Sequence, residues 1–178
     1  MRVFEVDHPA TQQVKVERVR RIFGEAPANV TYVAVDFNTQ TLADRMMAHG
    51  YDPRRKTVFL WQGVTYYLET GAVDDTLAFI AQQAASGSRL VFDYIDAALL
   101  SQPTTHSEVT SMRRYRGMTG EGLRFGIPVV EIENYLSQRG FTQVTNIRSE
   151  ELKERYFHGK NAARNVMSGY AIVSAVVR

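Results

Sequence analysis

Short runs rich in β-branched and aromatic residues alternate along this sequence with longer amphipathic stretches. The short runs are typical of strands, and the stretches between them have the hydrophobic period of helices, several of which would end near a glycine. Because strands that alternate with helices build βαβ units, the pattern predicts an α/β fold with a sheet that carries helices on both faces.

The pattern also places the individual elements. Strands are expected at residues 3–6, 31–35, 57–61, 89–94, 142–146 and 170–177. Helices are expected at residues 10–23, 41–49, 72–85, 129–139 and 150–157. The runs VFLW and LVFDY are apolar at nearly every position, which is typical of central strands covered on both faces. The last run, GYAIVSAVV, alternates less cleanly and is expected to be an inserted or edge strand.

A length of 178 residues is typical of a single domain, and the sequence shows neither an internal repeat nor an interdomain linker. We therefore expect one domain over residues 1–178. Residues 97–126 interrupt the alternation with a polar, basic and glycine-rich stretch that includes the RRYR run. Insertions of that length in compact domains are often lids or binding loops, so we expect a lid or insertion there.

Composition excludes several functional classes. The chain has 21 basic and 19 acidic residues, a balance that predicts no nucleic-acid partner. It has no cysteine, which excludes disulfides, thiolate metal sites and a cysteine nucleophile, and we expect no metal site. No apolar run approaches the roughly 20 residues that span a bilayer, and a long apolar signal region is missing from the beginning of the sequence. A cytoplasmic protein without a membrane partner is the expectation.

Acidic residues follow the first two expected strands, where ligands of open α/β sheets bind. Asp7 follows the first strand. An acid after the second strand of a nucleotide-binding half is the usual partner of ribose hydroxyls, because a carboxylate can accept two hydrogen bonds from a diol. Asp36 follows the second strand, and beside Phe37 it could accept from an adenine amino group while the ring packs on the base. Structural roles stay open, since Asp7 or Thr11 could cap the first helix and Asp36 could begin a turn.

Other polar residues favour structural interpretations. His8 has no second histidine or cysteine near it in the sequence, so a structural role is favoured over catalysis. The Tyr66–Tyr67 pair is more typical of packing, and RRYR is more typical of a solvated surface. No GxSxG, HExxH, GxGxxG or GxxxxGK motif occurs, which counts against a nicotinamide-dependent oxidoreductase and leaves the catalytic residues unknown.

Four segments carry a resemblance: FEVDHPATQQVK, TYVAVDF, TVFLWQGVTYYL and SRLVFDYI. Together they resemble the leucine carboxyl methyltransferase-like family, in particular its bacterial branch of S-adenosylmethionine-dependent methyltransferases. The segments occur in the order of the family between residues 3 and 94, and LRFGI, YLSQRGF and GYAIVSAVV continue the resemblance more loosely. It therefore covers nearly the whole chain.

The resemblance implies a class I methyltransferase fold, a Rossmann-like sheet in the order 3-2-1-4-5-7-6 with its last strand antiparallel and helices on both faces. It implies S-adenosyl-L-methionine as cofactor, with Asp7 on the ribose and with Asp36 and Phe37 on the adenine. The WEGV-like motif of the family lies beside the methionine and sulfonium part of the cofactor. Here the motif reads WQGV, so Gln62 supplies an amide where the family typically has an acid.

A strand and a glycine-rich turn of the GAGLDTR kind precede the EVDHP segment in the family, whereas here that segment occupies residues 5–9. The sequence therefore predicts a class I sheet that lacks its usual first strand, which would lie at the sheet centre. Three accounts follow: a fragment of a longer enzyme, which we favour, direct pairing of the second and fourth family strands, or a strand supplied by another chain.

The expected function is methyl transfer to a carboxylate or small-molecule acceptor, by an enzyme that this chain represents incompletely. Tyr66, Tyr94 and Arg124 are the expected contacts on the acceptor side, Arg124 because a guanidinium fork suits a carboxylate. The alternative is a non-catalytic interaction protein on a degenerate methyltransferase scaffold. Exposed sheet edges would also allow a homodimer.

Overall fold

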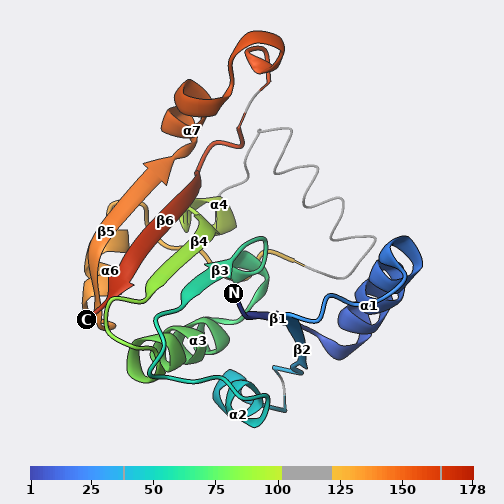
Figure 1. Cartoon of the computed structure of the whole chain (residues 1–178). Helices are drawn as coiled ribbons and strands as arrows, with labels where there is room; N and C mark the ends of the chain where they lie inside the picture. The colour runs from blue at the N-terminus through green and yellow to red at the C-terminus, as the bar shows by residue number, and fades with distance from the viewer. Residues whose placement is uncertain (38, 102–121, 165) are drawn as a thin grey trace. The chain divides into compact units, whose positions relative to one another are not determined.

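A computed structural model describes residues 1–37, 39–101, 122–164 and 166–178 (Figure 1). The chain divides into two compact units, Met1–Pro53 and Arg54–Arg178, where the sequence predicts one domain. We call them unit 1 and unit 2, and each is described by itself. No helix in the described ranges is long and apolar enough to cross a membrane.

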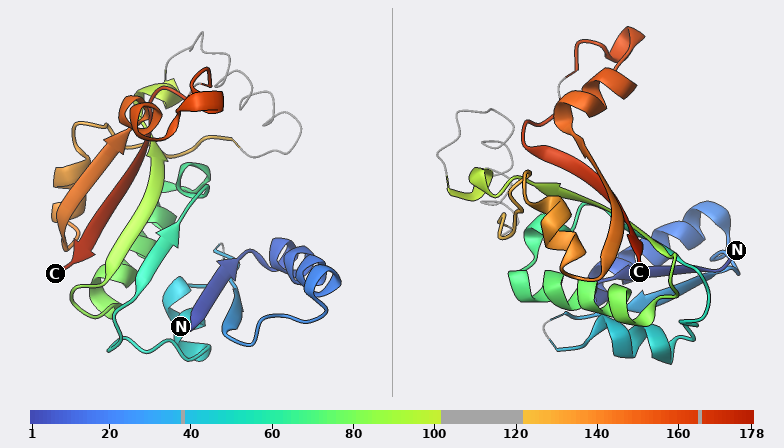
Figure 2. Two further views of the ribbon diagram at one scale, coloured as in Figure 1. Left: turned by 45° about the horizontal axis from the view of Figure 1, so that its top comes forward. Right: turned by 90° about the vertical axis from the view of Figure 1, so that its left-hand side faces the viewer.

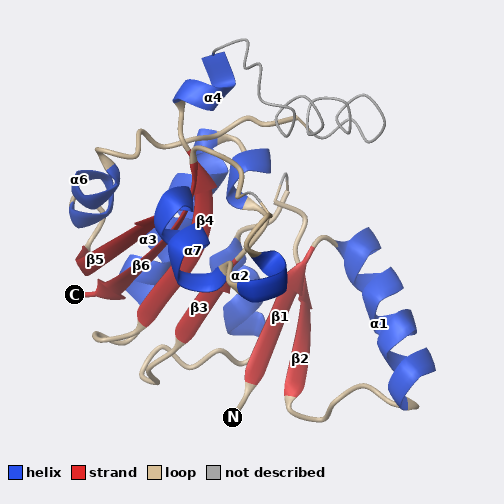
Figure 3. Ribbon diagram, turned by 90° about the horizontal axis from the view of Figure 1, so that it is seen from above, coloured by secondary structure: helices blue, strands red, loops and turns tan. Residues whose placement is uncertain are grey.

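Unit 1 is a βαβ unit followed by a short helix. Its elements are β1 (Val3–Asp7), α1 (Pro9–Phe23), β2 (Val30–Ala34) and α2 (Leu42–Ala48). The two strands are parallel, and the register runs from Val3 opposite Val30 to Asp7 opposite Ala34. Both strands are labelled in Figure 3. The predicted alternation of strand and helix is confirmed in this part of the chain.

The start of α1 differs from the prediction that Asp7 or Thr11 caps this helix. His8 is the N-cap, and its Nδ1 accepts a hydrogen bond from the Ala10 N–H at 3.4 Å. Asp7 cannot take this position because it still belongs to β1, where its carbonyl accepts from the Val35 N–H at 3.0 Å. Pro9 opens the helix, where its missing N–H leaves no hydrogen bond unmade. The structural interpretation of His8 is therefore confirmed.

Unit 2 contains a sheet of four strands in the order β3-β4-β6-β5. Its elements are β3 (Val58–Trp61), η1 (Thr65–Tyr67), α3 (Thr70–Gln83), β4 (Arg89–Ile95), α4 (Ala98–Ser101), α6 (Ile132–Ser137), β5 (Phe141–Arg148), α7 (Ser149–Tyr156), η2 (Gly159–Asn161) and β6 (Tyr170–Val177). β3 and β4 are parallel, whereas β6 runs antiparallel to both of its neighbours, β4 and β5 (Figure 2). The last strand is therefore inserted into the sheet, which is one of the two placements predicted for it.

One face of the unit 2 sheet forms the core. Leu90, Phe92 and Tyr94 of β4 point to this face, and each is at most 1% exposed. Helix α3 covers it with Val73, Leu77 and Ile80, all buried. Helix α6 is joined to α3 by hydrogen bonds from the Tyr135 hydroxyl and the Arg139 guanidinium to Asp74. The opposite face is less covered, because Val58 and Leu60 of β3 are 63% and 77% exposed.

The strand order matches the class I order expected from the sequence. In unit 1, β2 and β1 correspond to family strands 3 and 2. In unit 2, β3, β4, β6 and β5 correspond to family strands 4, 5, 7 and 6, and β6, the seventh family strand, is antiparallel. None of the described strands takes the position of the first family strand, as predicted. β1 and β2 form one sheet, and β3, β4, β6 and β5 form another.

Element bounds differ most around α6, predicted at residues 129–139 and observed at Ile132–Ser137. Before this helix the chain makes a turn, in which the Glu131 N–H donates to the Pro128 carbonyl at 2.8 Å. Most of the lid or insertion predicted at 97–126 lies outside the described residues. Its two ends are joined, since the Ile127 N–H donates to the Ile95 carbonyl at 3.0 Å. A Cβ on Gly126 would approach Ala97 Cα to 2.9 Å, so this contact requires glycine.

Candidate functional site

Two of the predicted acids lie at the same edge of the unit 1 sheet. Asp7 ends β1 opposite Ala34, and Asp36 follows two residues after that strand pair. Because β1 and β2 are parallel, their carboxyl ends meet at one edge, which is where open α/β sheets bind ligands. Unit 1 therefore presents two carboxylates from neighbouring strands at the expected position.

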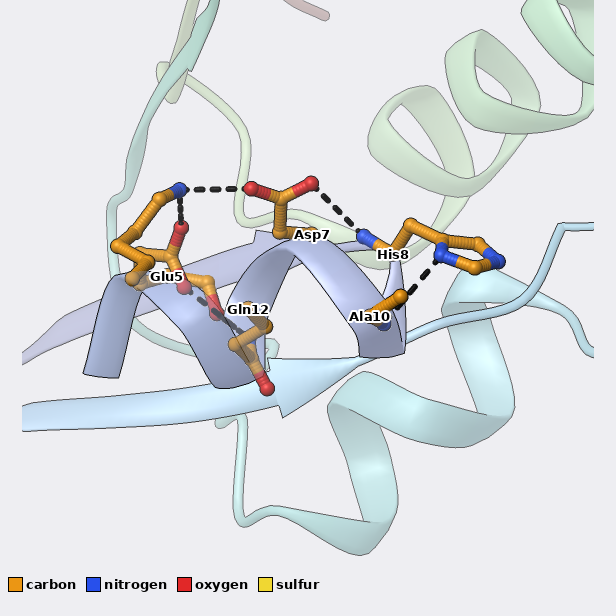
Figure 4. Close-up of polar contacts among 6 residues, drawn as sticks. Glu5, Asp7, His8, Ala10 and Gln12 are labelled. Carbon is orange, nitrogen blue, oxygen red and sulfur yellow. Dashed lines mark hydrogen bonds and ion pairs between the residues drawn. The ribbon is translucent and has the colours of Figure 1, made fainter. Parts of the chain in front are cut away.

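The Asp7 carboxylate is held by two donors. Its Oδ1 accepts from the His8 N–H at 2.8 Å, and its Oδ2 accepts from Lys15 Nζ at 2.7 Å. Lys15 also forms an ion pair with Glu5. Figure 4 shows Glu5 and Asp7 of β1 together with His8, the N-cap of α1. A carboxylate has about four acceptor positions, so an oriented Asp7 keeps two for a diol.

The charge on Lys15 is favoured by its two carboxylate partners. Partial burial acts to lower its pKa, but hydrogen bonds and charge attraction from Asp7 and Glu5 outweigh it, and the pKa is raised above its usual value. Gln12 fixes Glu5 from the same helix, as its buried amide donates to the Glu5 carbonyl at 3.2 Å and to the Glu5 carboxylate at 3.0 Å. Lys15 and Gln12 therefore orient both acids of β1.

Asp36 begins a turn, as the structural interpretation of this residue predicts. Its carbonyl accepts from the N–H groups of Thr39 at 3.0 Å and Gln40 at 2.8 Å, and its own N–H donates to Gln40 Oε1 at 3.2 Å. Phe37 is next in this turn and is half-buried. The turn fixes the backbone of Asp36 just after β2, and the adenine role of the two residues stays a prediction.

The WQGV motif forms a turn directly after β3 in unit 2. Gly63 has φ of 73°, a left-handed conformation that side chains other than glycine disfavour. Its N–H donates to Asp93 Oδ1 at 2.8 Å. Gln62 precedes it and is exposed. The backbone conformation by itself therefore favours glycine at position 63, and this preference does not depend on what Gln62 contacts.

Asp93 is a buried carboxylate at the carboxyl end of β4, and only 4% of it is exposed. Its Oδ2 accepts from the Tyr170 hydroxyl at 2.7 Å, so both oxygens have a donor. Its carbonyl accepts from Thr65 Oγ1 at 2.6 Å. Hydrogen bonds to a charged acceptor are stronger than neutral ones, which compensates for burial of this carboxylate. Asp93 therefore links three segments of unit 2.

Tyr66 lies beside this network. The side chain is 8% exposed and belongs to a small apolar cluster with Ile95 and Leu99. Burial, followed by the negative charge of Asp93, raises the pKa of the Tyr66 hydroxyl to about 12. The ring meets Tyr67 edge to face, with centroids 4.7 Å apart, as the packing interpretation of this pair predicts. Tyr66 is therefore a neutral hydroxyl at physiological pH.

Arg124 is attached to the same part of unit 2. Its N–H donates to the Tyr66 carbonyl at 2.8 Å, and its guanidinium pairs with Glu69 at 2.5 Å. The Arg124 side chain is 52% exposed, so this ion pair is a surface pair that contributes little to stability. A guanidinium has five donors, so Arg124 can keep Glu69 and still bind a second carboxylate.

Tyr94 occupies a different place from the other predicted acceptor contacts. It is completely buried on the core face of the sheet, and its hydroxyl donates to Asn146 Oδ1 at 3.1 Å. Burial raises the pKa of this hydroxyl to about 12 although the Asn146 hydrogen bond lowers it. Side chains alternate along a strand, so Tyr94 faces away from Asp93. These contacts favour a structural role.

Several residues of the two clusters were not singled out from the sequence. Lys15 is ten residues from Glu5, and Tyr170 is 77 residues from Asp93, so neither contact has a local signal. The available signal in unit 2 is the position of Asp93 near the carboxyl end of the strand expected at residues 89–94. No group of three or more histidine, cysteine or acidic side chains that could hold a metal ion occurs among the residues the structure describes.

Comparison with known proteins shows which family the chain resembles. Residues 1–81 match the leucine carboxyl methyltransferase family. The chain is 28% identical over 160 residues to the Bacillus subtilis protein named "Putative S-adenosyl-L-methionine-dependent methyltransferase YktD", covering 90% of this chain and 52% of that protein. A Mycolicibacterium smegmatis protein named likewise is 31% identical over 150 residues, covering 79% of this chain and 48% of its own length. The chain thus spans about half the length of these relatives, and the predicted resemblance is confirmed.

Solved methyltransferase structures show the same fold. The S-adenosylmethionine-dependent methyltransferase SibL aligns with a TM-score of 0.57 and 16% identity over 99% of this chain and 43% of its own. A crystal structure from Thermobifida fusca titled as a "putative methyltransferase" aligns with a TM-score of 0.64 and 17% identity over 99% of this chain and 63% of its own. The class I methyltransferase fold predicted from the sequence is confirmed.

Proposed function

We propose that the chain is part of an S-adenosyl-L-methionine-dependent methyltransferase that acts on a carboxylate or small-molecule acceptor. The observation that carries the proposal is the pair of acids, Asp7 and Asp36, at the carboxyl ends of neighbouring parallel strands within the segment that matches the family. The names of the relatives support the same cofactor. The cofactor is an intracellular metabolite, so a cytoplasmic location belongs to this proposal.

Unit 1 supplies the contacts to the adenosine half in this proposal. Asp7, oriented by His8 and Lys15, would accept hydrogen bonds from the ribose hydroxyls. Asp36 would accept from the adenine amino group, and Phe37 would pack on the base. Gln62 of unit 2 would accept from the amine of the methionine part, without the charge that a carboxylate would add.

Unit 2 supplies the acceptor contacts. Arg124 would bind an acceptor carboxylate, and Tyr66 would donate from a hydroxyl that stays protonated. Tyr94 was predicted to join them, and its burial favours support of the sheet instead. When bound, the cofactor supplies a methyl group on a sulfonium, which makes that carbon electrophilic. An ionised carboxylate needs no base before it attacks, so these residues would act mainly by positioning the acceptor in line and excluding water.

A specific observation favours a second candidate, a non-catalytic interaction protein or a homodimer. β3 pairs with β4 along one side, and Val58 and Leu60 on its face are largely exposed. Strands with open edges and exposed apolar side chains pair readily with another strand. Size measurement by analytical ultracentrifugation would test it: a dimer that Leu60→Lys dissociates supports this candidate, and a monomer at high concentration rejects the dimer.

Calorimetric titration of the chain with S-adenosylhomocysteine tests the leading proposal. The product lacks the sulfonium charge, so binding does not depend on an acid at position 62. We expect saturable binding with a dissociation constant near 1 μM, about −8 kcal/mol. Asp36→Ala should abolish this binding, whereas Asp75→Ala, which removes an exposed acid on α3, should leave it unchanged. Absence of heat with the unaltered chain at millimolar concentrations would reject cofactor binding by this chain.

A further inference from the structure

The carboxylate of Asp93 connects the WQGV turn with the last strand of unit 2. One oxygen accepts from the Gly63 N–H at 2.8 Å, and the other accepts from the Tyr170 hydroxyl at 2.7 Å. Asp93 is 4% exposed, so water does not readily replace either donor. We propose that Asp93 is a positioning residue, which holds the Gly63 turn in place for the cofactor and is itself oriented by Tyr170.

The turn depends on Asp93 because the Gly63 N–H donates to this carboxylate and not to a backbone carbonyl of the β3–β4 ladder. Gly63 lies beyond the β3–β4 ladder, which ends at the Trp61–Phe92 pair, and its φ of 73° takes the chain out of the strand direction. A side-chain carboxylate therefore replaces the backbone acceptor that a longer ladder would have supplied. The Thr65 hydroxyl adds a second tie, since it donates to the Asp93 carbonyl at 2.6 Å. Both ends of the turn are thus fixed to one residue of β4.

Tyr170 determines how the carboxylate is oriented. It is the first residue of β6 and pairs with Ile95 of β4, so its ring lies over the strand end that carries Asp93. Burial and the Asp93 carboxylate raise the Tyr170 pKa above its usual value, so the hydroxyl remains a donor throughout the neutral range. With Oδ2 bound to Tyr170, Oδ1 is directed at the Gly63 N–H.

The cofactor part of this inference rests on the proposed function, which assigns the WQGV turn to the methionine side of the cofactor. The hydrogen bonds of Asp93 with Gly63 and Tyr170 do not depend on the proposed function. Gln62 is joined covalently to Gly63, so the position of its amide follows the position of the turn. A buried acid that neither binds the cofactor nor reacts can therefore affect the affinity through the backbone.

Two variants and a matched control separate positioning from stability. Tyr170→Phe removes the donor to Asp93 and keeps the ring, while Tyr135→Phe removes an equivalent hydroxyl that donates to Asp74 at 2.9 Å between α3 and α6. Asp93→Asn keeps an oxygen for Gly63 and an amide N–H for the Tyr170 oxygen, while Asp93→Ala removes both contacts. Urea unfolding of each variant establishes that the measured protein is folded.

The dissociation constant for S-adenosylhomocysteine is the first measurement. We expect Tyr170→Phe to weaken binding about tenfold, the effect of one hydrogen bond to a charged group, and Tyr135→Phe to leave it unchanged. Asp93→Ala should weaken binding further, and Asp93→Asn should restore most of the loss. Equal affinity in Tyr170→Phe and the unaltered chain, or equal loss in Asp93→Asn and Asp93→Ala, would overturn positioning of the cofactor by Asp93.

Hydrogen exchange of the Gly63 amide, followed by NMR without ligand, is the second measurement. Asp93→Ala and Tyr170→Phe should accelerate exchange of this amide, and Tyr135→Phe should not. If the unaltered chain does not bind S-adenosylhomocysteine, the proposed function and the cofactor part of the inference both fail. Accelerated exchange would then still support Asp93 as the residue that holds the turn, and unchanged exchange would overturn that as well.

Discussion

Unit 1 and unit 2 differ in how much core supports their candidate ligand contacts. Unit 1 has a sheet of two strands, and the buried apolar side chains among its described residues are Val33, Val35, Met46 and Tyr51. Unit 2 has four strands, one face of which is buried by α3 and α6. Small sheets of two strands are marginally stable because they remove little apolar surface from water.

The difference teaches that the candidate ligand contacts of each unit have different physical supports. Asp7 and Asp36 are held mainly by polar contacts near the surface, including the Lys15 ion pairs. Asp93 is held inside a packed sheet. A ligand that binds Asp7 and Asp36 would therefore also stabilise unit 1 by binding its folded form alone.

The largest expected difference between the units is in hydrogen exchange. Backbone amides of β1 and β2 should exchange through local opening with free energies near zero, whereas those of β4 and β6 should approach the global value, about 5 kcal/mol or more. Native-state exchange followed by NMR measures both. Equal protection in the two units would break the comparison by showing that they unfold together.

A matched pair of phenylalanine substitutions gives the next largest effect. Phe92 of β4 is 1% exposed, and Phe23 at the end of α1 is 71% exposed. Phe92→Ala should reduce the free energy of unfolding by about 3–5 kcal/mol, and Phe23→Ala should change it by about 0.5 kcal/mol or less. Urea titration followed by circular dichroism measures both, and a large cost for Phe23→Ala would show that α1 is covered in solution.

Two glycines with left-handed backbones sharpen the comparison further. Gly24 in unit 1 has φ of 83° and Gly63 in unit 2 has φ of 73°, and a Cβ at either position has open space or ordinary contact. Substitution by alanine should therefore cost about 1–2 kcal/mol of backbone strain at each. Gly63→Ala should lower the urea midpoint of unit 2, while Gly24→Ala should change amide exchange in unit 1 alone. A shared effect on both units would contradict their independence.

A further effect is a pH dependence of the stability of unit 2 at alkaline pH. The pKa of Tyr66 and that of Tyr94 are raised to about 12, compared with about 10 in an unfolded chain. Between these values the unfolded state binds fewer protons, so the free energy of unfolding falls as pH rises from about 10 to 12. Tyr66→Phe and Tyr94→Phe should each reduce this slope in urea titrations at alkaline pH. An unchanged slope in both variants would refute the raised values.

The sequence predicted the strands, most of the helices and their order because each depends on local hydrophobic period or on motifs of the family. It missed contacts between residues far apart, such as Asp93 with Tyr170, because no local pattern encodes them. It assigned Tyr94 to the acceptor side because strand ends were taken without regard to which face each side chain occupies. The sequence could not decide between the two roles of Asp36, because a turn and an adenine contact both favour an aspartate at this position.

The insertion of β6 between β4 and β5 has a consequence for synthesis on the ribosome. β4 and β5 become neighbours of a common strand only after residues 170–177 have been translated, so the unit 2 sheet cannot assemble stepwise as the chain emerges. Until then the apolar edges of β4 and β5 are open to other chains. A nascent chain arrested before Tyr170 should therefore be a strong client of ribosome-associated chaperones, whereas one released after Val177 should not.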